Sequence, residues 1–220
     1  MSKASNFTIN KNKGTTDLSA FNNGWYAKQI GAPRWKQFVW YFVNVIFFIN
    51  PLNVSSGLKV KLLRLFGSTI GKGVVIKPNV NIKYPWLLSV GNHSWIGEKV
   101  WIDNLAPVTL GDHVCLSQGV LLLTGNHNYK KPTFDLMIGP IQIEQGVWVG
   151  AKSVVTPGVK CQSHAVLAVQ SVATSDLESY TIYQGNPATP RRKRPIKSSP
   201  HFYNHQMKNN EKNLHHHGLP

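Results

Sequence analysis

Residues 141–173 read IQIEQGVWVGAKSVVTPGVKCQSHAVLAVQSVA, and this stretch decides the fold. An aliphatic or small residue recurs at every sixth position, and these anchors are Ile143, Val149, Val155, Cys161, Leu167 and Ala173. Because residues two apart on a strand share a face, the residue four places after each anchor points inward together with the next anchor. A helix would need a spacing of about 3.6. The period of six therefore predicts short strands that are separated by corners.

The same period runs back to residue 70, with short slips at residues 84–88 and 105–109 and one long interruption after residue 122. The earlier anchors are Ile70, Ile76, Ile82, Val90, Ile96, Ile102, Leu110, Leu116 and Leu122. Glycine follows several anchors, as Gly71 and Gly150 do. We expect it to turn the corner because glycine accepts positive φ without strain. The repeat predicts a mainly β solenoid over residues 67–189.

The long interruption, residues 124–141, reads TGNHNYKKPTFDLMIGPI and is too polar and too rich in Gly and Pro to form another coil. A loop of this length that leaves a regular solenoid is more often functional than decorative. It holds His127, and imidazole suits a general base because its pKa lies near operating pH. On its own a histidine indicates no more than a polar surface, but in this loop His127 becomes the predicted base.

The chain is strongly basic, with 24 Lys and Arg against 9 Asp and Glu and a formal net charge of +15. This charge predicts an anionic partner, and nucleic acid, anionic lipid headgroups and a phosphorylated cofactor all fit it. The basic residues are dispersed except for the run 191–194, so we expect residues 190–220 to form a flexible basic tail. Two cysteines without Cys-x-x-Cys spacing, and no secretory signal, indicate a reducing cytoplasm.

Residues 1–66 form an N-terminal extension whose most apolar stretch, 38–49, reads FVWYFVNVIFFI. The stretch is shorter than the roughly 20 residues that a membrane-spanning helix needs. We expect a helix that packs on the solenoid or on a neighbouring subunit. A helix lying in a bilayer surface is the alternative, because Trp35, Trp40 and Tyr41 suit an interface.

The chain resembles the WcaF-like branch of the hexapeptide-repeat sugar O-acetyltransferases in a set of segments, which are RWKQFVWYFVNVIFF, VVIKPNVNIKYPW, WIDNLAPV, VCLSQGVLLLTGNHNY, FDL, WVGAKSVVTPGV and YQGNPATP. The resemblance runs from about Trp35 to Arg191, about seven tenths of the chain. It implies a left-handed parallel β-helix, acetyl-CoA as the acetyl donor, and a sugar hydroxyl in polysaccharide biosynthesis as the acceptor. It also implies a homotrimer in which two subunits build each site.

The resemblance assigns roles to individual residues. The loop histidine, which is His127 here, is implied to take the proton of the sugar hydroxyl while that oxygen attacks the thioester in a ternary complex. The residues that it places near the acceptor are Asp103, Asn104, Asn126 and Trp148. The residues that it places along acetyl-CoA are Ala151, Val169 and Thr174. Ser175 stands where relatives often have a cation, so Arg191 and Arg192 are expected to contact the phosphates instead.

Alternatives remain open on the residues alone. A metal-dependent hydratase on the same fold would bind zinc through three histidines, but His93, His113 and His127 lack the expected spacing, so we expect no metal. A covalent route through Cys115 or Ser117 has no obvious base. A scaffold protein of polysaccharide assembly, or an acetyltransferase acting on a drug, would carry the same repeat. The expected partners are a free or glycolipid-linked sugar and further copies of the chain, with peripheral association at the inner membrane face and no nucleic acid.

Overall fold

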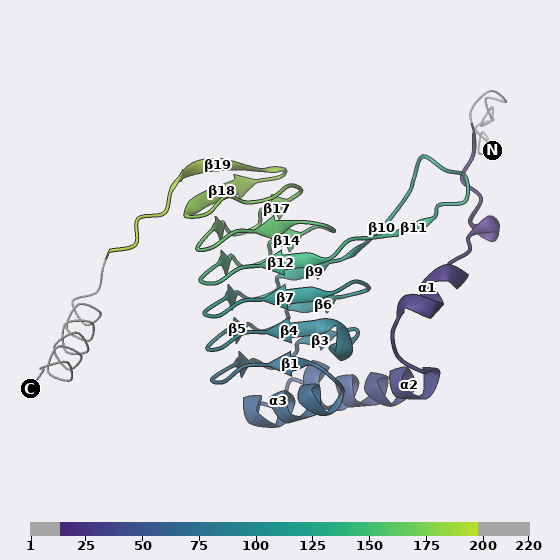
Figure 1. The fold of residues 1–220 in the computed structure, drawn as a ribbon, viewed down its shortest axis with the longest axis horizontal. Coiled ribbons are helices and arrows are strands. Elements are labelled where there is room, and N and C mark those ends of the chain that lie inside the picture. Colours follow the sequence, from purple (N-terminus) through teal and green to yellow (C-terminus); the bar gives the residue numbers. More distant parts are fainter. Residues whose placement is uncertain (1–13, 198–220) are drawn as a thin grey trace, which may run out of the picture.

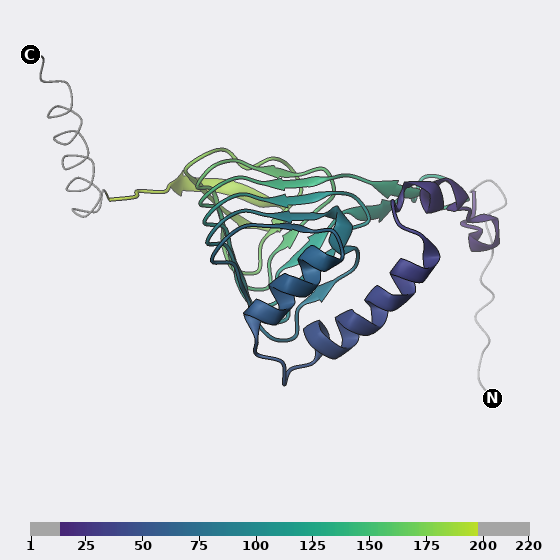
Figure 2. The same cartoon turned by 60° about the horizontal axis from the view of Figure 1, so that its bottom comes forward.

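The computed structural model describes residues 14–197, which form a parallel β-solenoid of about six coils with helices at one end (Figure 1). Seen obliquely from that end, the coils outline a three-sided prism (Figure 2). Each face is one sheet, and successive strands of a coil belong to faces A, B and C in turn. The predicted solenoid is therefore confirmed.

The three faces consist of short strands in parallel register. Face A contains β1 (Thr69–Ile70), β4 (Leu88–Val90), β7 (Val108–Leu110), β12 (Ile141–Ile143) and β15 (Lys160–Cys161). Face B contains β2 (Val75–Ile76), β5 (Trp95–Ile96), β8 (Cys115–Leu116), β13 (Trp148–Val149), β16 (Val166–Leu167), β18 (Thr181–Gly185) and the antiparallel edge strand β19 (Ala188–Lys193). Face C contains β3 (Asn81–Ile82), β6 (Trp101–Asp103), β9 (Leu121–Leu123), β14 (Val154–Val155) and β17 (Val172–Ala173).

The interior of the prism is filled by the repeat. Every anchor is buried, and so is the inward residue that follows most anchors by four places, as predicted; the latter set comprises Val74, Val80, Ser94, Val100, Ala106, Val114, Val120, Val147, Ser153, Val159, Ala165 and Ser171. Two buried serines donate their hydroxyls to backbone carbonyls, Ser94 to Gly111 at 2.8 Å and Ser153 to Ala168 at 2.7 Å. These hydrogen bonds offset the cost of burying a polar group in the core.

The reason given for glycine after an anchor was wrong. Gly71 and Gly150 do not have positive φ. The residues in the left-handed region include His93 and Lys152, and each comes two positions after the glycine of its own corner. A Cβ on Gly150 would lie 2.6 Å from the amide nitrogen of Val169 in the next coil. Glycine is therefore required because adjacent coils approach too closely at the corner for any side chain.

The outward residues differ from face to face. The outward column on face A is polar and consists of Thr69, Ser89, Thr109, Gln142 and Lys160. The column on face B is mostly apolar and consists of Val75, Trp95, Cys115, Trp148, Val166 and Ile182. On face C it consists of Asn81, Trp101, Leu121, Val154 and Val172. Two of the three faces therefore present large apolar side chains.

Helices cover the first coil and the flank of the solenoid. The elements are η1 (Leu18–Ala20), α1 (Gly24–Gln29), α2 (Arg34–Val43), the π-helical η2 (Asn44–Ile49), α3 (Ser56–Leu65) and, at the first slip of the repeat, η3 (Pro85–Leu87). Trp40 and Phe48 are buried against the first coil, and the Trp40 indole donates to the Ile82 carbonyl at 2.8 Å. The predicted helix over residues 38–49 thus packs on its own solenoid. Within residues 14–197 no helix has the length and apolarity needed to cross a bilayer.

The long loop and the C-terminal end depart from the regular coil. The loop contains β10 (Gly125–His127), which pairs antiparallel with β11 (Leu136–Ile138) and projects from the corner between faces C and A toward α1 (Figure 1). At the other end β19 runs to Lys193, so the basic tail that was predicted to begin at residue 190 starts inside a strand. Residues 198–220 of that tail, including the His run at 215–217, lie outside the described residues.

Candidate active site

His127 ends β10 and is held by its own loop. Its Nδ1 lies 2.9 Å from the carbonyl oxygen of Phe134, and its ring stacks on the Phe134 ring with centroids 4.5 Å apart. A carbonyl oxygen can only accept a hydrogen bond, so Nδ1 carries the proton and Nε2 keeps a free lone pair in the neutral ring. Asn126, whose side chain is exposed, accepts the His127 amide N–H at 2.8 Å. The loop therefore presents an oriented imidazole whose neutral form has its lone pair on Nε2.

His127 lines a pocket of about 360 Å³ between the solenoid and the N-terminal segment. One wall comes from residues 21–30, including Phe21, Tyr26 and Ile30. The Tyr26 hydroxyl donates to the Leu105 carbonyl at 2.9 Å, which fixes α1 against the solenoid. The opposite wall includes Lys83, Tyr84, Leu105 and Leu136. Sequence reasoning missed this N-terminal wall, because residues 21–30 carry no repeat.

Asp103 lies behind this pocket as half of an ion pair. Its Oδ1 is 3.0 Å from Lys83 Nζ, although the approach does not have hydrogen-bond geometry and that buried oxygen has no hydrogen-bond partner within residues 14–197. Burial and the Asp103 carboxylate together raise the pKa of Tyr84, which keeps the phenol protonated. The pocket therefore offers a cation and a neutral phenol to a hydroxylated ligand.

Asn104, which was predicted to lie near the acceptor, does not line the pocket. It is fully buried, its Oδ1 accepts the Tyr84 amide N–H at 2.9 Å, and its Nδ2 donates to the Tyr84 carbonyl at 2.6 Å. A side chain with no exposed surface and both ends engaged cannot contact a substrate. Asn104 is instead a positioning residue that fixes the backbone of Tyr84.

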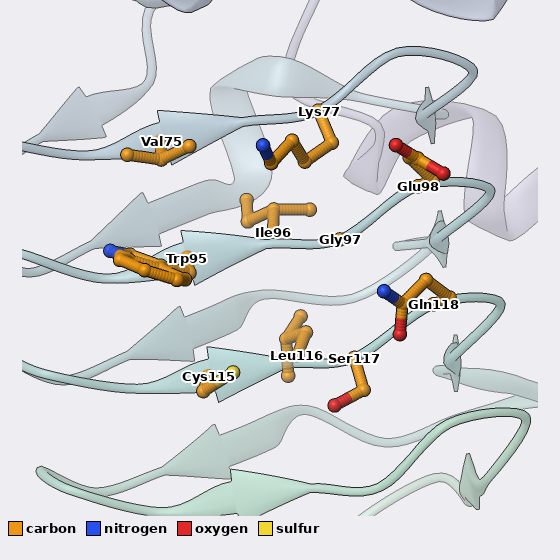
Figure 3. Close-up of a pocket in the computed structure, with 10 residues that line it drawn as sticks. All are labelled: Val75, Lys77, Trp95, Ile96, Gly97, Glu98, Cys115, Leu116, Ser117 and Gln118. Carbon is orange, nitrogen blue, oxygen red and sulfur yellow. The ribbon is translucent and has the colours of Figure 1, made fainter.

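Trp148, which was predicted to lie near the acceptor, and the residues predicted to hold acetyl-CoA lie elsewhere on the same chain. Trp148 is on face B, where its indole donates to the Ser117 hydroxyl at 2.9 Å. Ala151 and Val169 follow β13 and β16 at the B–C corner, where neither amide N–H donates a hydrogen bond within the described residues. A groove on face B has a volume of about 250 Å³ and is lined by Trp95, Cys115 and Ser117 among others (Figure 3).

Thr174 and the two arginines also lie on different faces. Thr174 follows β17 and lies at the C–A corner, which is the corner that carries the loop of His127. Arg191 and Arg192 lie in β19 at the edge of face B, and Arg192 pairs with Ile182 of β18. One protomer therefore does not bring the imidazole together with Trp148, Ala151 and Val169.

Within residues 14–197 the two cysteines, His93 and His113 are not arranged for catalysis. Burial raises the pKa of the Cys115 thiol, and it raises the pKa of Cys161 to about 12. Neither thiol is therefore an activated nucleophile. His93 and His113 stack on each other at the A–B corner with centroids 5.4 Å apart, away from His127 at the C–A corner. One protomer does not bring these three imidazoles together as a zinc site would need.

The fold and the loop imidazole together define a class, the hexapeptide-repeat acyltransferases. Searches against known proteins agree with that class, although no family model matches the chain. The Escherichia coli K12 protein WcaF, named as a colanic acid biosynthesis acetyltransferase, is 35% identical over 156 residues, which cover 71% of this chain and 86% of WcaF. Nodulation protein L of Rhizobium meliloti is 31% identical over 125 residues, 56% of this chain and 68% of that protein.

Solved structures show the same architecture. A hexapeptide-repeat acetyltransferase of Vibrio cholerae, crystallised with acetyl-CoA, superposes with a TM-score of 0.61 at 25% identity over 78% of this chain and 88% of that chain. The chain belongs to the hexapeptide-repeat acetyltransferases and, within them, to the family of WcaF-like colanic acid biosynthesis acetyltransferases.

Proposed function

We propose that this protein transfers the acetyl group of acetyl-CoA to a hydroxyl of a sugar used in polysaccharide biosynthesis, with His127 as the general base. The observation that carries the proposal is the hydrogen bond from His127 Nδ1 to the Phe134 carbonyl, which leaves Nε2 free on a histidine that lines a pocket of sugar size. Family membership supplies the acetyl-transfer chemistry. The free cysteines, Cys115 and Cys161, fit the reducing cytoplasm as the compartment of this reaction.

The reaction is a direct transfer in a ternary complex. The sugar hydroxyl lies in the pocket beside Lys83 and Tyr84, and its proton passes to His127 Nε2 while its oxygen attacks the thioester carbonyl carbon. The tetrahedral intermediate then collapses, the C–S bond breaks, and the imidazolium returns the proton to the departing thiolate of CoA. The Phe134 carbonyl stabilises the imidazolium because it accepts from Nδ1–H in both protonation states. Asn126 orients the His127 backbone in this scheme.

We further propose that the complete site forms between subunits of a homotrimer. Apolar columns on faces B and C, with Trp95, Trp148 and Trp101 each more than two fifths exposed, favour burial against other copies. A second protomer would bring Trp148 and the free amides of Ala151 and Val169 to the imidazole of the first. In this arrangement Arg191, Arg192 and Thr174 serve the phosphate end of CoA.

The test is thiol release from acetyl-CoA with a panel of acceptors: free sugars, nucleotide sugars and lipid-linked sugars. In His127→Ala we expect turnover to fall by about a hundredfold or more with CoA affinity preserved, because only the proton transfer is removed. His113→Ala is the matched control, since His113 is an exposed corner imidazole and should retain activity. Full activity in His127→Ala would refute the proposed base, and a wild-type protein that releases no thiol with any acceptor would favour a scaffold role instead.

A further inference from the structure

The outer side of the helices that cover the first coil is apolar and exposed. It comprises Trp35, Phe38, Val39, Tyr41, Phe42, Val45, Ile46, Leu52 and Val54, which we call the base patch. Phe38 and Tyr41 are 65% and 63% exposed, although both lie in a helix whose other side is buried on the solenoid. A helix that is apolar on all sides is ordinarily covered, and a contiguous patch of this kind marks an interaction surface.

The stretch of sequence that carries the base patch has charged residues of positive sign only. Between Asp17 and Glu98 the sequence contains no acidic residue and nine lysines and arginines. Arg34 begins α2 and Lys61 lies on α3, and both side chains are exposed. An apolar surface with aromatic residues and a cationic border is complementary to an anionic bilayer, where apolar groups enter below the headgroups and cations meet phosphate.

We propose that the base patch docks the protein onto the surface of an anionic lipid membrane. The helices lie on the bilayer and do not cross it, since none of those in the described part of the chain is long enough to span one. A second copy of the chain is the less suitable occupant, because apposing two base patches would bring two regions without acidic residues face to face. Trp35 and Tyr41 suit the headgroup level.

This docking names the substrate class of the proposed active site and rests on the proposed function. The segment that forms one wall of the His127 pocket, residues 21–30, continues through residues 31–33 into α2 and the base patch. The loop of His127 leaves the third coil, two coils above the one that the helices cover; two strand spacings and one helix diameter place it about 20 Å from the outer side of the helices. A sugar attached to a membrane lipid can span that distance, so the acceptor is a lipid-linked sugar.

The docking test uses the full chain and co-sedimentation with vesicles of phosphatidylcholine, with and without phosphatidylglycerol. We expect binding to the anionic vesicles, weakened by salt, and at least a tenfold loss of binding in Trp35→Asp/Ile46→Asp. Ile196→Asp is the matched control, because Ile196 is an exposed apolar residue after β19 at the other end of the solenoid. Wild-type protein that ignores anionic vesicles, or a double variant that binds as the wild type does, would overturn the proposal.

Two further measurements separate this proposal from its alternatives. Without lipid, light scattering should give the double variant the same molar mass as the wild type. If the double variant forms a smaller assembly and the wild type does not bind vesicles, another copy of the chain covers the patch and the proposal fails. The acceptor class is determined by comparing the rate of acetylation of one sugar when it is free and when it is anchored on vesicles. We expect Trp35→Asp/Ile46→Asp to lower kcat/KM only for the anchored form. Vesicle binding without transfer to any acceptor would contradict the proposed function and leave the docking intact.

Discussion

Replacing Asn104 by alanine separates a positioning role from direct contact with the acceptor. The side chain is fully buried and makes two hydrogen bonds to the backbone of Tyr84, at 2.9 and 2.6 Å. Alanine removes both partners at once and leaves an N–H and a C=O unpaired. Each such loss costs about 1–3 kcal/mol when the group stays buried. Because Tyr84 is only half-buried and water can reach part of it, we expect a total near the lower end, about 2–3 kcal/mol.

That loss of free energy of unfolding is measurable. For a domain of this size, 1 kcal/mol corresponds to about 2–4 °C in Tm, so Asn104→Ala should unfold about 4–12 °C below the wild type. Circular dichroism or scanning fluorimetry at fixed protein concentration gives the value. Asn126→Ala is the matched control: its side chain is exposed and accepts a single hydrogen bond, so its Tm should change by a few degrees at most.

Kinetics complete the test. With Tyr84 released, the pocket wall shifts and KM for the acceptor rises together with the loss of Tm. An Asn104→Ala variant with the Tm of the wild type and a raised acceptor KM would show that Asn104 contacts the acceptor directly. The reasoning from burial would then be refuted.

Two other predictions concern the coil corners. In Gly150→Ala the new Cβ would lie 2.6 Å from the Val169 nitrogen, so the coils must separate where acetyl-CoA is proposed to bind. Calorimetry should show that CoA affinity falls tenfold or more and that Tm is lower. An unchanged CoA affinity and Tm would contradict the assignment of this corner to acetyl-CoA. Burial and a neighbouring guanidinium lower the pKa of His164 from 6.5, so the unfolded chain binds more protons, and stability present above pH 6.5 falls as pH drops below it. His164→Gln should flatten Tm between pH 6.5 and about 5, before the carboxylates titrate, and an unchanged slope would assign this pH dependence to other groups.

The period of six was sufficient to predict the solenoid, because burial of one residue in six and its inward partner is a local rule that every coil repeats. The role of the corner glycines was not predictable in the same way. Positive φ is a property of one residue, whereas the 2.6 Å between the Val169 nitrogen and a Cβ placed on Gly150 depends on residues nineteen positions apart. A close approach between coils becomes visible only when the coils are stacked.

The site was predictable only in part for a related reason. His127 stood out because its loop interrupts the repeat, and the structure adds the Phe134 carbonyl that fixes its tautomer. Phe21 and Tyr26 gave no signal, since the N-terminal segment has no period and reaches the pocket through tertiary contacts such as the hydrogen bond to Leu105. Asn104 was misassigned because a motif identifies a residue without saying which way its side chain points.

One further periodic signal, spanning three repeats, bears on the proposed assembly. The residue before each anchor points outward, and along the chain these residues follow the order polar, apolar, apolar in most coils, as in Thr109, Cys115, Leu121 and again Gln142, Trp148. A coil that closes after three strands converts this order into one polar face and two apolar faces. The order can be interpreted only once the closure is known, because three strands per coil is a property of the fold. It then supports the proposed homotrimer, in which faces B and C meet other copies while face A meets water. Since His127 lies at the edge of one apolar face and Trp148 on the other, burial of both faces in that trimer would bring an imidazole and an indole from different chains into one site.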